Sequence, residues 1–285
     1  MKPAPFRYHR AKAIDEAVEL LAELAPAQGR VLAGGQSLVP AMAFRLARPA
    51  HLVDINGIEE LGRLSQDGKE LAIGACVRHA AFHRPVVDGS LGGMLSAVAR
   101  HIGHYPIRQR GTFCGSLAHA DPASEWCLVA VTLGATVTAR SVRGSRDIAA
   151  PDFIAGLMTT ALEEDELLVS VRLPIPPADT RYGFCEFSRR AGDFAIAMAL
   201  ASYRLEDGVM VDARIGVGGV EDRPRRVSEA EKALGGHTPG PETFGAAAEA
   251  AAEAVDPMED ANIGADHRRD LVAALTRRAL ERAAG

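Results

Sequence analysis

The sequence predicts an α+β fold, and three observations carry this prediction. Asp67-Gly68 and Asp207-Gly208 each stand between apolar runs, and this dipeptide is the strongest short-range signal for a β-hairpin. Alanine-rich helical stretches gather after residue 228, whereas in a doubly wound sheet helices alternate with the strands. The chain has 285 residues, of which 47% are hydrophobic, and this is enough for two or three subdomains around sizeable cores.

The composition argues against several classes of protein. No stretch approaches the roughly 18 consecutive apolar residues of a membrane-spanning helix. The N-terminal MKPAPFRYHR lacks the apolar segment of a secretory signal, so we expect a cytoplasmic protein. The net charge of -5 argues against a nucleic-acid partner, because broad contact with a phosphate backbone takes an excess of basic residues.

The cysteines are too scattered to hold a metal. They form no C-x-x-C pair and have no histidine at ligand spacing, whereas the thiolates of zinc and iron–sulfur sites come in tight groups. Four cysteines in this length also give no secreted disulfide framework. We expect buried small side chains at Cys76, Cys127 and Cys185, and any redox metal on another chain.

The first predicted subdomain, residues 1–57, contains short helices and strands. Apolar residues from Ile14 to Leu24 recur at helical spacing, and Pro26 and Gly29 end that helix. Residues 30–33 and 51–55 are predicted strands, and a second helical stretch follows Pro40.

The second predicted subdomain, residues 58–176, begins with a hairpin and ends at a proline-rich breaker. Its expected elements are a hairpin within 61–77, a helix within 87–103, a Gly- and polar-rich loop at 105–121, a helix from Pro122 through Trp126 to Leu133, and strands at 135–139 and 167–173. Pro174-Ile175-Pro176-Pro177 then marks a subdomain boundary.

The third predicted subdomain, residues 177–285, is expected to be a three-stranded antiparallel sheet with helices. Its predicted strands are 183–189, 195–205 and 209–218, and its predicted helices are 228–234, 241–254 and 266–283. Gly216-Val217-Gly218-Gly219 resembles a dinucleotide fingerprint only superficially, since Glu221 stands where the third glycine is needed. A strand end and turn is the better interpretation.

Two glycine-containing loops carry the functional signal. The first, Ala33-Gly34-Gly35-Gln36-Ser37, lies between a strand and a helical stretch, and the second runs from Arg110 to Ser116. Glycines let the backbone approach a ligand closely and point successive N–H groups into an anion site. Each loop alone is more often an ordinary turn. Together they suggest the two sides of a pyrophosphate clamp, which needs no lysine in a chain that has only four.

Six stretches together carry a family resemblance. They are AGGQSL (33–38), RLARP (45–49), HLVDI (51–55), IRQRGTFCGSLAHADP (107–122), RRAGDFA (189–195) and GVGGV (216–220). This combination resembles the FAD-binding medium subunit of molybdenum hydroxylases, which include carbon monoxide dehydrogenases and the flavin domain of xanthine dehydrogenase. The resemblance implies a two-part FAD-binding domain of the PCMH (vanillyl-alcohol-oxidase-like) type and a separate C-terminal domain.

The same resemblance implies which residues bind FAD. Residues 33–37 and 112–116 would surround the pyrophosphate, Ile102 would lie by the adenine, and Glu125 would lie near the ribose or ribityl hydroxyls. Leu168 would pack on the flavin, and Asp193 and Phe194 would flank the isoalloxazine. The full implied set is Leu32, Ala33, Gly34, Gly35, Gln36, Ser37, Leu38, Ile102, Ile107, Thr112, Phe113, Cys114, Gly115, Ser116, Glu125, Leu168, Asp193 and Phe194. No catalytic or metal-binding residue is implied in this chain.

Cys114 departs from the family pattern. The second loop usually reads Thr-Ile-Gly-Gly, and here a cysteine replaces the first glycine of that pair. If this position needed a positive φ, a cysteine would cost on the order of 1 kcal/mol or more. Either the loop accepts a negative φ or FAD binds more loosely, and we favour the first interpretation.

Other polar residues are expected to be structural. His51, His104 and His119 have no spacing of a metal-ligand pair, and a hydrogen-bonding role suits His119. The arginines at 108, 110, 189 and 190 could bind phosphate, but bracing of loops is at least as common. The acidic run 163–166 is expected to be a solvated turn.

The resemblance implies an electron-transfer flavoprotein subunit. A large partner would hold the molybdenum cofactor and a small partner two [2Fe-2S] clusters, in a heterotrimer or its dimer. This chain would pass electrons through FAD to NAD, a quinone or oxygen. Two other hypotheses stay open, a stand-alone FAD-dependent reductase resembling the enolpyruvyl reductases and a binding module with a decayed flavin site. Gln36 stands where carbon monoxide dehydrogenases often carry histidine, which favours an organic substrate.

Overall fold

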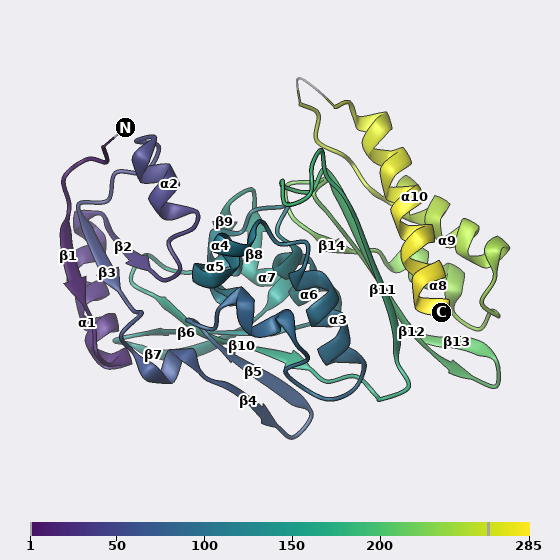
Figure 1. Cartoon of the computed structure of the whole chain (residues 1–285), viewed down its shortest axis with the longest axis horizontal. Helices are drawn as coiled ribbons and strands as arrows, with labels where there is room; N and C mark the ends of the chain where they lie inside the picture. The colour runs from purple at the N-terminus through teal and green to yellow at the C-terminus, as the bar shows by residue number, and fades with distance from the viewer. Residues whose placement is uncertain (1, 261–262) are drawn as a thin grey trace.

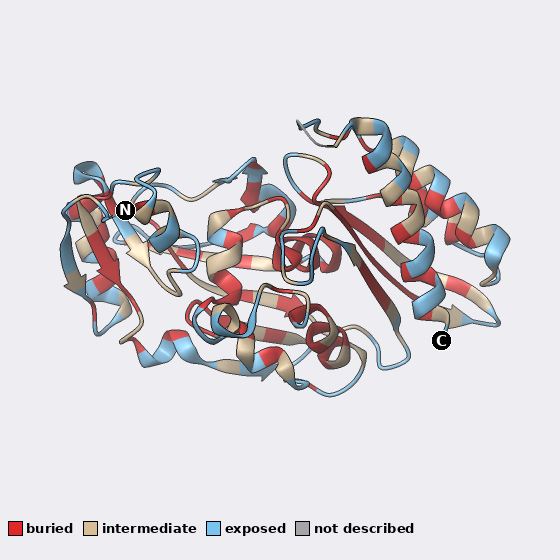
Figure 2. Ribbon diagram, turned by 45° about the horizontal axis from the view of Figure 1, so that its top comes forward, coloured by how far each residue is buried: buried red, intermediate tan, exposed pale blue. Residues whose placement is uncertain are grey.

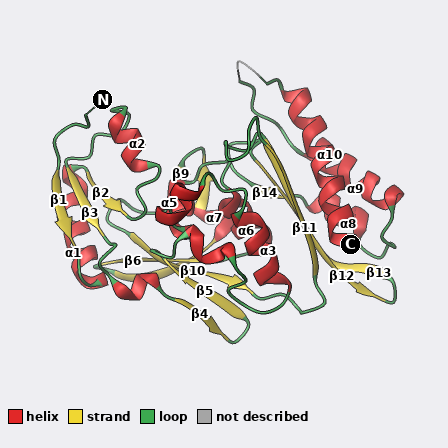
Figure 3. Ribbon diagram, viewed as in Figure 1, coloured by secondary structure: helices red, strands yellow, loops and turns green. Residues whose placement is uncertain are grey.

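The strands of this protein gather into separate sheets that follow one another along the molecule, from the N-terminal end to the C-terminal end (Figure 1). The computed structural model describes residues 2–260 and 263–285. Helices and antiparallel sheets are segregated rather than alternating, which confirms the α+β prediction (Figure 3).

The N-terminal unit is a small parallel sheet of order β1-β3-β2. Helix α1 buries its apolar stripe of Ala17, Val18, Leu21 and Leu24, as the sequence periodicity predicts. Because β2 and β3 are parallel, the residues that follow them emerge at the same edge of the sheet. The elements are β1 (Arg7–Arg10), α1 (Ile14–Leu24), the 3-10 helix η1 (Ala25–Ala27), β2 (Gly29–Leu32), α2 (Leu38–Ala43) and β3 (His51–Asp54).

The middle unit is an antiparallel sheet of order β4-β5-β10-β6-β7 with helices packed on it. The hairpin of β4 and β5 turns at Gly68, whose φ is +57°, as predicted from the Asp-Gly pair. The elements are η2 (Glu59–Gly62), β4 (Leu64–Asp67), β5 (Glu70–Gly74), η3 (His79–His83), α3 (Ser90–Ala99), α4 (Tyr105–Arg110), α5 (Phe113–His119), α6 (Glu125–Leu133), β6 (Thr136–Ser141), β7 (Gly144–Ala149), α7 (Ala150–Phe153), β8 (Ile154–Gly156), β9 (Thr159–Thr160) and β10 (Leu167–Pro174).

The C-terminal unit is a sheet covered on both faces. Helices α8 and α10 pack against the sheet, α9 packs on both of these helices, and α3 and α6 of the middle unit also contact the strands. Strands of this sheet carry long buried stretches (Figure 2), and β12 is buried from Ala197 to Tyr203. The elements are β11 (Arg181–Phe187), β12 (Ala197–Glu206), β13 (Val209–Gly218), β14 (Arg225–Arg226), α8 (Ser228–Leu234), α9 (Pro241–Ala254) and α10 (Ala265–Ala284).

This sheet has four strands in the order β11-β12-β13-β14, so the prediction of three strands was wrong by one. The additional strand β14 has only two residues, which pair with Gly216 and Val217. So short an element has no detectable alternation of apolar residues, and it exists because the edge of β13 offers unpaired backbone groups. The end of β13 is the strand end and turn expected there, with Gly219 at a φ of +78°.

The loop expected over 105–121 is instead largely helical. It contains α4, which has a proline in its first turn, and α5, where the Thr112 side chain accepts a hydrogen bond from the backbone N–H of Gly115 at 2.9 Å. Phe113 and Leu117 bury the inner face of α5. The many small and polar residues hid a helix that tertiary burial stabilises.

Other local predictions also changed in detail. Pro122 lies before α6, which begins at Glu125, and its carbonyl accepts the N–H of Gly219 at 2.9 Å. The short elements β7, α7, β8 and β9 were missed.

One apolar core joins the N-terminal and middle units, and a second fills the C-terminal unit. We keep residues 57 and 176 as proposed subdomain boundaries.

Candidate functional site

The two glycine loops lie against each other. A Cβ atom placed on Gly34 would stand 2.4 Å from the carbonyl oxygen of Arg110 and 2.7 Å from the Cα of Gly111. Real Cβ atoms do not approach backbone so closely, so only glycine permits this contact. The next residue, Gly35, has a φ of +72°, which also favours glycine. The two loops that the sequence pairs are therefore in direct backbone contact, and their binding of a pyrophosphate stays a prediction.

Asn56 and Arg78 connect the two loops by hydrogen bonds. The Asn56 amide donates to the carbonyl of Ala33 at 2.8 Å, and the Arg78 guanidinium donates to both the Asn56 side chain and the Arg110 carbonyl. Sequence reasoning missed both residues. Asn56 had a usable signal, because it follows a strand that is parallel to the strand before the first loop. Arg78 had none, since only the fold brings it to the loop.

Asp54 anchors the hydrogen-bond network of Asn56 and Arg78. Its carboxylate accepts hydrogen bonds from the Tyr8 hydroxyl and from the backbone N–H of Asn56, the latter at 2.9 Å. Burial by itself would raise the pKa of Asp54, but these hydrogen bonds outweigh burial and lower the pKa below its usual value. The charged carboxylate thus fixes Asn56, which in turn fixes the first loop.

His79 supports the second loop from inside. Its Nδ1 accepts a hydrogen bond from the Trp126 indole at 2.9 Å, and its Nε2 would be 2.5 Å from a Cβ on Gly111. Burial, with the charges of Arg78 and Arg108, lowers the pKa of His79 to about 4, so the ring is neutral at pH 7. Gly111 is therefore packed against an uncharged core histidine.

A cavity of about 390 Å³ opens between the N-terminal and middle units. It is lined by first-loop residue Ala33, by Cys114 and Gly115 at the start of α5, and by Leu168 on β10. Four residues implied by the family resemblance thus meet in one hollow, although they come from three separate regions of the sequence. A volume of this size suits a part of a large cofactor.

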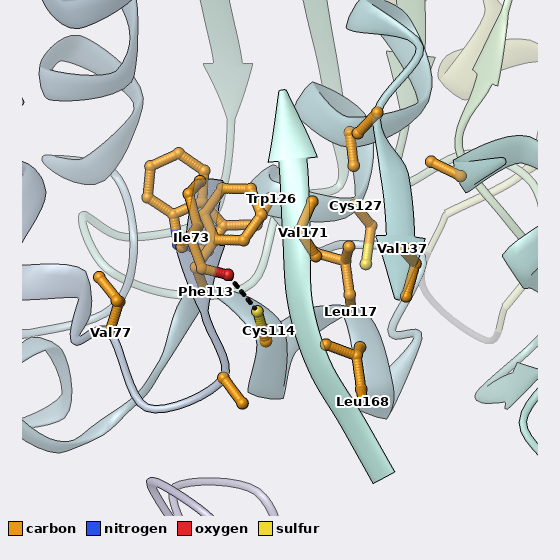
Figure 4. Packing of buried hydrophobic residues seen from close by; sticks show 14 of the residues in the cluster. Ile73, Val77, Phe113, Cys114, Leu117, Trp126, Cys127, Val137, Leu168 and Val171 are labelled. Carbon is orange, nitrogen blue, oxygen red and sulfur yellow. Dashed lines mark hydrogen bonds between the residues drawn. The ribbon is translucent and has the colours of Figure 1, made fainter. Parts of the chain in front are cut away.

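Cys114 takes no strained conformation. It lies in the first turn of α5 and is not among the residues with positive φ, which confirms the interpretation favoured from the sequence. Its thiol points into the core and donates to the carbonyl of Ile73 at 3.5 Å (Figure 4). Burial raises the pKa of this thiol, so it stays neutral. The cysteine therefore fills core space instead of disturbing the loop.

The other residues of the two loops divide between core and surface. Phe113 is fully buried in a ring cluster with Phe82 and Trp126, so only its backbone can face a ligand. Gln36 and Ser37 are exposed, and the Gln36 amide donates to the carbonyl of Gly34 at 3.1 Å. The remaining predicted loop residues, all partly exposed, are Leu32, Leu38, Ile107 and Ser116.

Ile102 and Ile107 lie together around the turn at Gly103. The Arg108 guanidinium donates to the carbonyls of Ile102 at 2.9 Å and Gly103 at 2.7 Å. Gly103 has a φ of +49°, and the side chain of Ile107 is within 3.2 Å of the Cβ it lacks. Arg108 therefore braces this turn, as expected for a loop-supporting arginine, and the placement of adenine beside Ile102 stays a prediction.

Asp193 and Phe194 line a different cavity from Leu168. That cavity holds about 400 Å³ and is bordered by Pro122, Met158 and Arg268. Phe194 is 74% exposed, so its ring is available to a ligand or a partner. The preceding Gly192 has a φ of +85° and packs against His104, which ties this loop to the middle unit. The expected position beside an isoalloxazine stays a prediction.

Glu125 lies deeper than the resemblance implies. The residue is only 8% exposed, and it lines neither the cavity at Leu168 nor the one at Phe194. Burial, together with the nearby carboxylate of Glu186, raises the pKa of Glu125 to about 8. Burial likewise raises the pKa of Glu186 to about 7. At neutral pH, Glu125 is therefore mostly a protonated, hydrogen-bond-donating carboxyl group.

Replacing Glu125 by glutamine is expected to remove a loss of stability that occurs as the pH rises from about 5 to about 8. The folded carboxyl has a pKa of about 8 and its reference value is 4.5, so the folded state holds an extra proton between these values. That stability is fully present below the reference pKa and is lost as the pH rises through the folded pKa. The thermal unfolding midpoint of the wild-type chain should fall more steeply with rising pH than that of Glu125→Gln, between about pH 5 and about pH 8. Glu253→Gln, on the surface of α9, is the matched control, and parallel profiles for Glu125→Gln and wild type would contradict the assignment.

The acidic run 163–166 is more ordered than the predicted solvated turn. Glu166 is buried and forms two hydrogen bonds of 2.7 Å with Arg146, and Asp165 pairs with Arg143. The pKa of Glu166 is lowered by the hydrogen bond from Arg146. Glu163, Glu164 and Glu166 also line the cavity at Leu168.

The arrangement is suited to holding a dinucleotide rather than to bond-breaking by side chains. Ala33, Cys114 and Gly115 of the two touching loops line the cavity at Leu168, and the side chains of His79 and Cys114 nearby are neutral. The residues present therefore fit a flavin dinucleotide. Among residues 2–260 and 263–285, no group of three or more His, Cys, Asp or Glu side chains could hold a metal ion. Within the same residues, no helix is long and apolar enough to cross a membrane.

Comparisons with known proteins agree with this geometry. Residues 4–176 match the model of the FAD binding domain in molybdopterin dehydrogenase, and residues 182–283 match the CO dehydrogenase flavoprotein C-terminal domain. Together these two family models cover nearly the whole chain.

Individual relatives match over their full length. The chain is 39% identical to the nicotine 6-hydroxylase medium subunit of Paenarthrobacter nicotinovorans, over 98% of each chain. It is 34% identical to the carbon monoxide dehydrogenase medium chain of Afipia carboxidovorans, over 99% of this chain and 98% of that one. The crystal structure of quinoline 2-oxidoreductase from Pseudomonas putida 86 matches with a TM-score of 0.93 and 38% identity, over 100% of this chain and 98% of that chain. By its sequence, its fold and its paired glycine loops, this chain belongs to the family of FAD-binding medium subunits of molybdenum hydroxylases.

Proposed function

We propose that this chain is the electron-transfer subunit of a heterotrimeric molybdenum hydroxylase. A large partner would hold the molybdenum cofactor and oxidise the substrate, and a small partner would hold two [2Fe-2S] clusters. FAD on this chain would receive the electrons and deliver them to an external acceptor. The protein's own work is then to bind and orient the flavin, since the redox chemistry belongs to the cofactor.

The backbone contact between Gly34 and Arg110 is the observation that carries the proposal. It brings the two loops together beside the cavity at Leu168, and the Asn56–Arg78 hydrogen bonds hold that arrangement. A site held this rigidly can bind a dinucleotide with little loss of conformational entropy.

Exposed apolar side chains support the proposal of partner chains. Leu46 is 84% exposed and Phe44 is 67% exposed, both directly after α2. Other large exposed apolar residues are Val39, Tyr105, Leu157, Met158 and Phe194. Clustered apolar residues on a surface are typical of protein contacts. We propose that the large and small subunits cover parts of this surface.

The substrate would bind the proposed large partner and not this chain, so the names of relatives suggest the first compounds to test. Nicotine and quinoline appear in the names of two relatives, and both are nitrogen heterocycles. We propose a nitrogen-heterocyclic substrate for the complex. The acceptor (NAD, a quinone or oxygen) and the cytoplasmic location stay predictions.

An absorption spectrum of the chain, purified with whatever accompanies it, tests the proposal. We expect about one FAD per chain, released on heating. Iron–sulfur absorbance should co-purify with a small partner, and molybdenum should co-purify with a large partner. Bleaching of the flavin band on adding substrate anaerobically would support electron transfer through this chain.

Two results would overturn the proposal. Flavin without any partner, together with substrate turnover by the isolated chain and NADPH, would instead support the stand-alone reductase. Absence of flavin even after added FAD would mean that the clamp does not bind the cofactor.

A further inference from the structure

A third cavity, of about 380 Å³, lies between the middle unit and the C-terminal sheet. It shares no lining residue with the cavities at Leu168 and Phe194. Its walls come from α3, from the segment 174–177 and from strands β11 to β14. The flavin loops do not reach it, so the proposed function leaves this space unexplained.

Arg214 on β13 is the least compensated charge in this cavity. Its guanidinium donates to the carbonyl of Leu133 at 2.5 Å and forms no ion pair with any carboxylate in the described part of the chain. Burial and the charge of Arg226 lower the pKa of Arg214, and they outweigh the carboxylates of Glu231 and Asp212, which act in the opposite direction. A half-buried cation in this position is stabilised by an anion placed beside it.

The other two arginines of the cavity are already paired. Arg204 forms ion pairs with Asp179, Glu206 and Asp212, and Arg226 forms a two-bond pair with Glu231. These neighbouring carboxylates limit how much negative charge the cavity can accept. The arrangement therefore suits a ligand with one negative charge better than a phosphate dianion.

Two hydroxyl groups of the cavity residues lack partners. Ser90 and Thr180 both line the cavity, and the side-chain oxygen of each is buried without a hydrogen-bond partner among the described residues. Buried hydroxyls are usually hydrogen-bonded, so two such groups beside one hollow indicate a missing polar partner. Ser90 is the first residue of α3 and Thr180 directly precedes β11, and these two elements pack against each other.

Apart from Ser202 and Asp212, the rest of the wall is apolar. Its apolar part includes Leu91, Met94, Leu133, Ile175 and Leu200, with the Tyr182 ring beside them. A cavity of this size, with a few charged and hydroxyl groups among largely apolar walls, is typical of a small-molecule site.

We propose that this cavity binds a small organic monocarboxylate with an apolar body. The carboxylate would pair with Arg214, hydroxyls of Ser90 and Thr180 would complete its hydrogen bonds, and the apolar body would contact Leu91 and Leu200. Because the walls come from both the middle and the C-terminal units, the ligand would also strengthen their contact.

Calorimetric titration of the full chain with FAD bound tests this proposal, with benzoate as the probe. Benzyl alcohol has the same ring without the carboxylate, and inorganic phosphate is an anion without the ring. We expect benzoate to bind at least about 10-fold more tightly than either compound. Equal binding of benzoate and benzyl alcohol would overturn the proposal.

Variants separate the charge from the shape of the cavity. Arg214→Met keeps the aliphatic stem and should weaken benzoate binding by about 10-fold or more, whereas Arg277→Met, on the exposed face of α10, should not change it. Leu91→Trp fills the cavity without touching a charge and should abolish binding. Unchanged binding in both cavity variants would place benzoate elsewhere and overturn the proposal. FAD content should stay at the wild-type value in every variant, which distinguishes failure here from failure of the flavin site.

Discussion

Gly34→Ala is expected to lose most of its FAD while keeping its fold. The added methyl group would stand 2.4 Å from the Arg110 carbonyl oxygen, which is backbone and cannot rotate away. Overpacking of this kind costs about 1–3 kcal/mol. If the loops separate to relieve it, FAD should bind roughly 5- to 150-fold more weakly. Fluorescence titration of the flavin-free chain with FAD measures the change.

The control for this prediction is Gly62→Ala. No atom lies within 4 Å of the Cβ that this substitution adds, so it tests loss of a glycine without a loop contact. We expect wild-type FAD affinity in Gly62→Ala. If Gly34→Ala also bound FAD normally, the contact between the loops would not be what forms the site.

Trp126→Ala should be the most destabilising single substitution near the site. Trp126 is fully buried, packs against the tilted rings of Phe82 and Phe113, and donates its indole N–H to His79. Truncating a buried tryptophan costs about 3–5 kcal/mol. Urea unfolding should be followed by circular dichroism, because Trp126 is the only tryptophan and its fluorescence disappears in the variant.

Two further variants separate packing from the hydrogen bond. Trp126→Phe keeps a ring but leaves Nδ1 of His79 without its donor, and it should cost about 1–3 kcal/mol. Phe44→Ala removes an aromatic ring that is largely exposed and should change stability little. If Trp126→Ala were no more destabilising than Phe44→Ala, the ring cluster would not support the second loop.

Local signals in the sequence were sufficient for most of the fold. The helix from Ile14 to Leu24 has a one-sided apolar stripe, and the two Asp-Gly hairpins have a turn residue that takes positive φ. These features act over a few residues, so they are readable without the fold. Helix α5 and strand β14 were not readable, because burial stabilises the first and the free edge of β13 stabilises the second.

The candidate site likewise has features that the sequence predicts and features that only the fold produces. The glycines at 34, 35 and 115 and the whole family resemblance are properties of the sequence, because a close backbone approach needs those residue types. The linkage of the loops through Asn56 and Arg78 depends on residues 22 positions apart that meet only in the folded chain. The neutral state of Glu125 depends on burial beside Glu186, which no local pattern contains.

The sequence by itself therefore determined the α+β class, the two glycine loops and membership in a flavoprotein family, since all three rest on residue types and short spacings. Only the tertiary structure decided that the loops touch at Gly34, that Cys114 points into the core, and that Arg214 lies unpaired at a cavity between two units. These features arise from long-range packing and desolvation, which depend on neighbours that the chain acquires only when it folds.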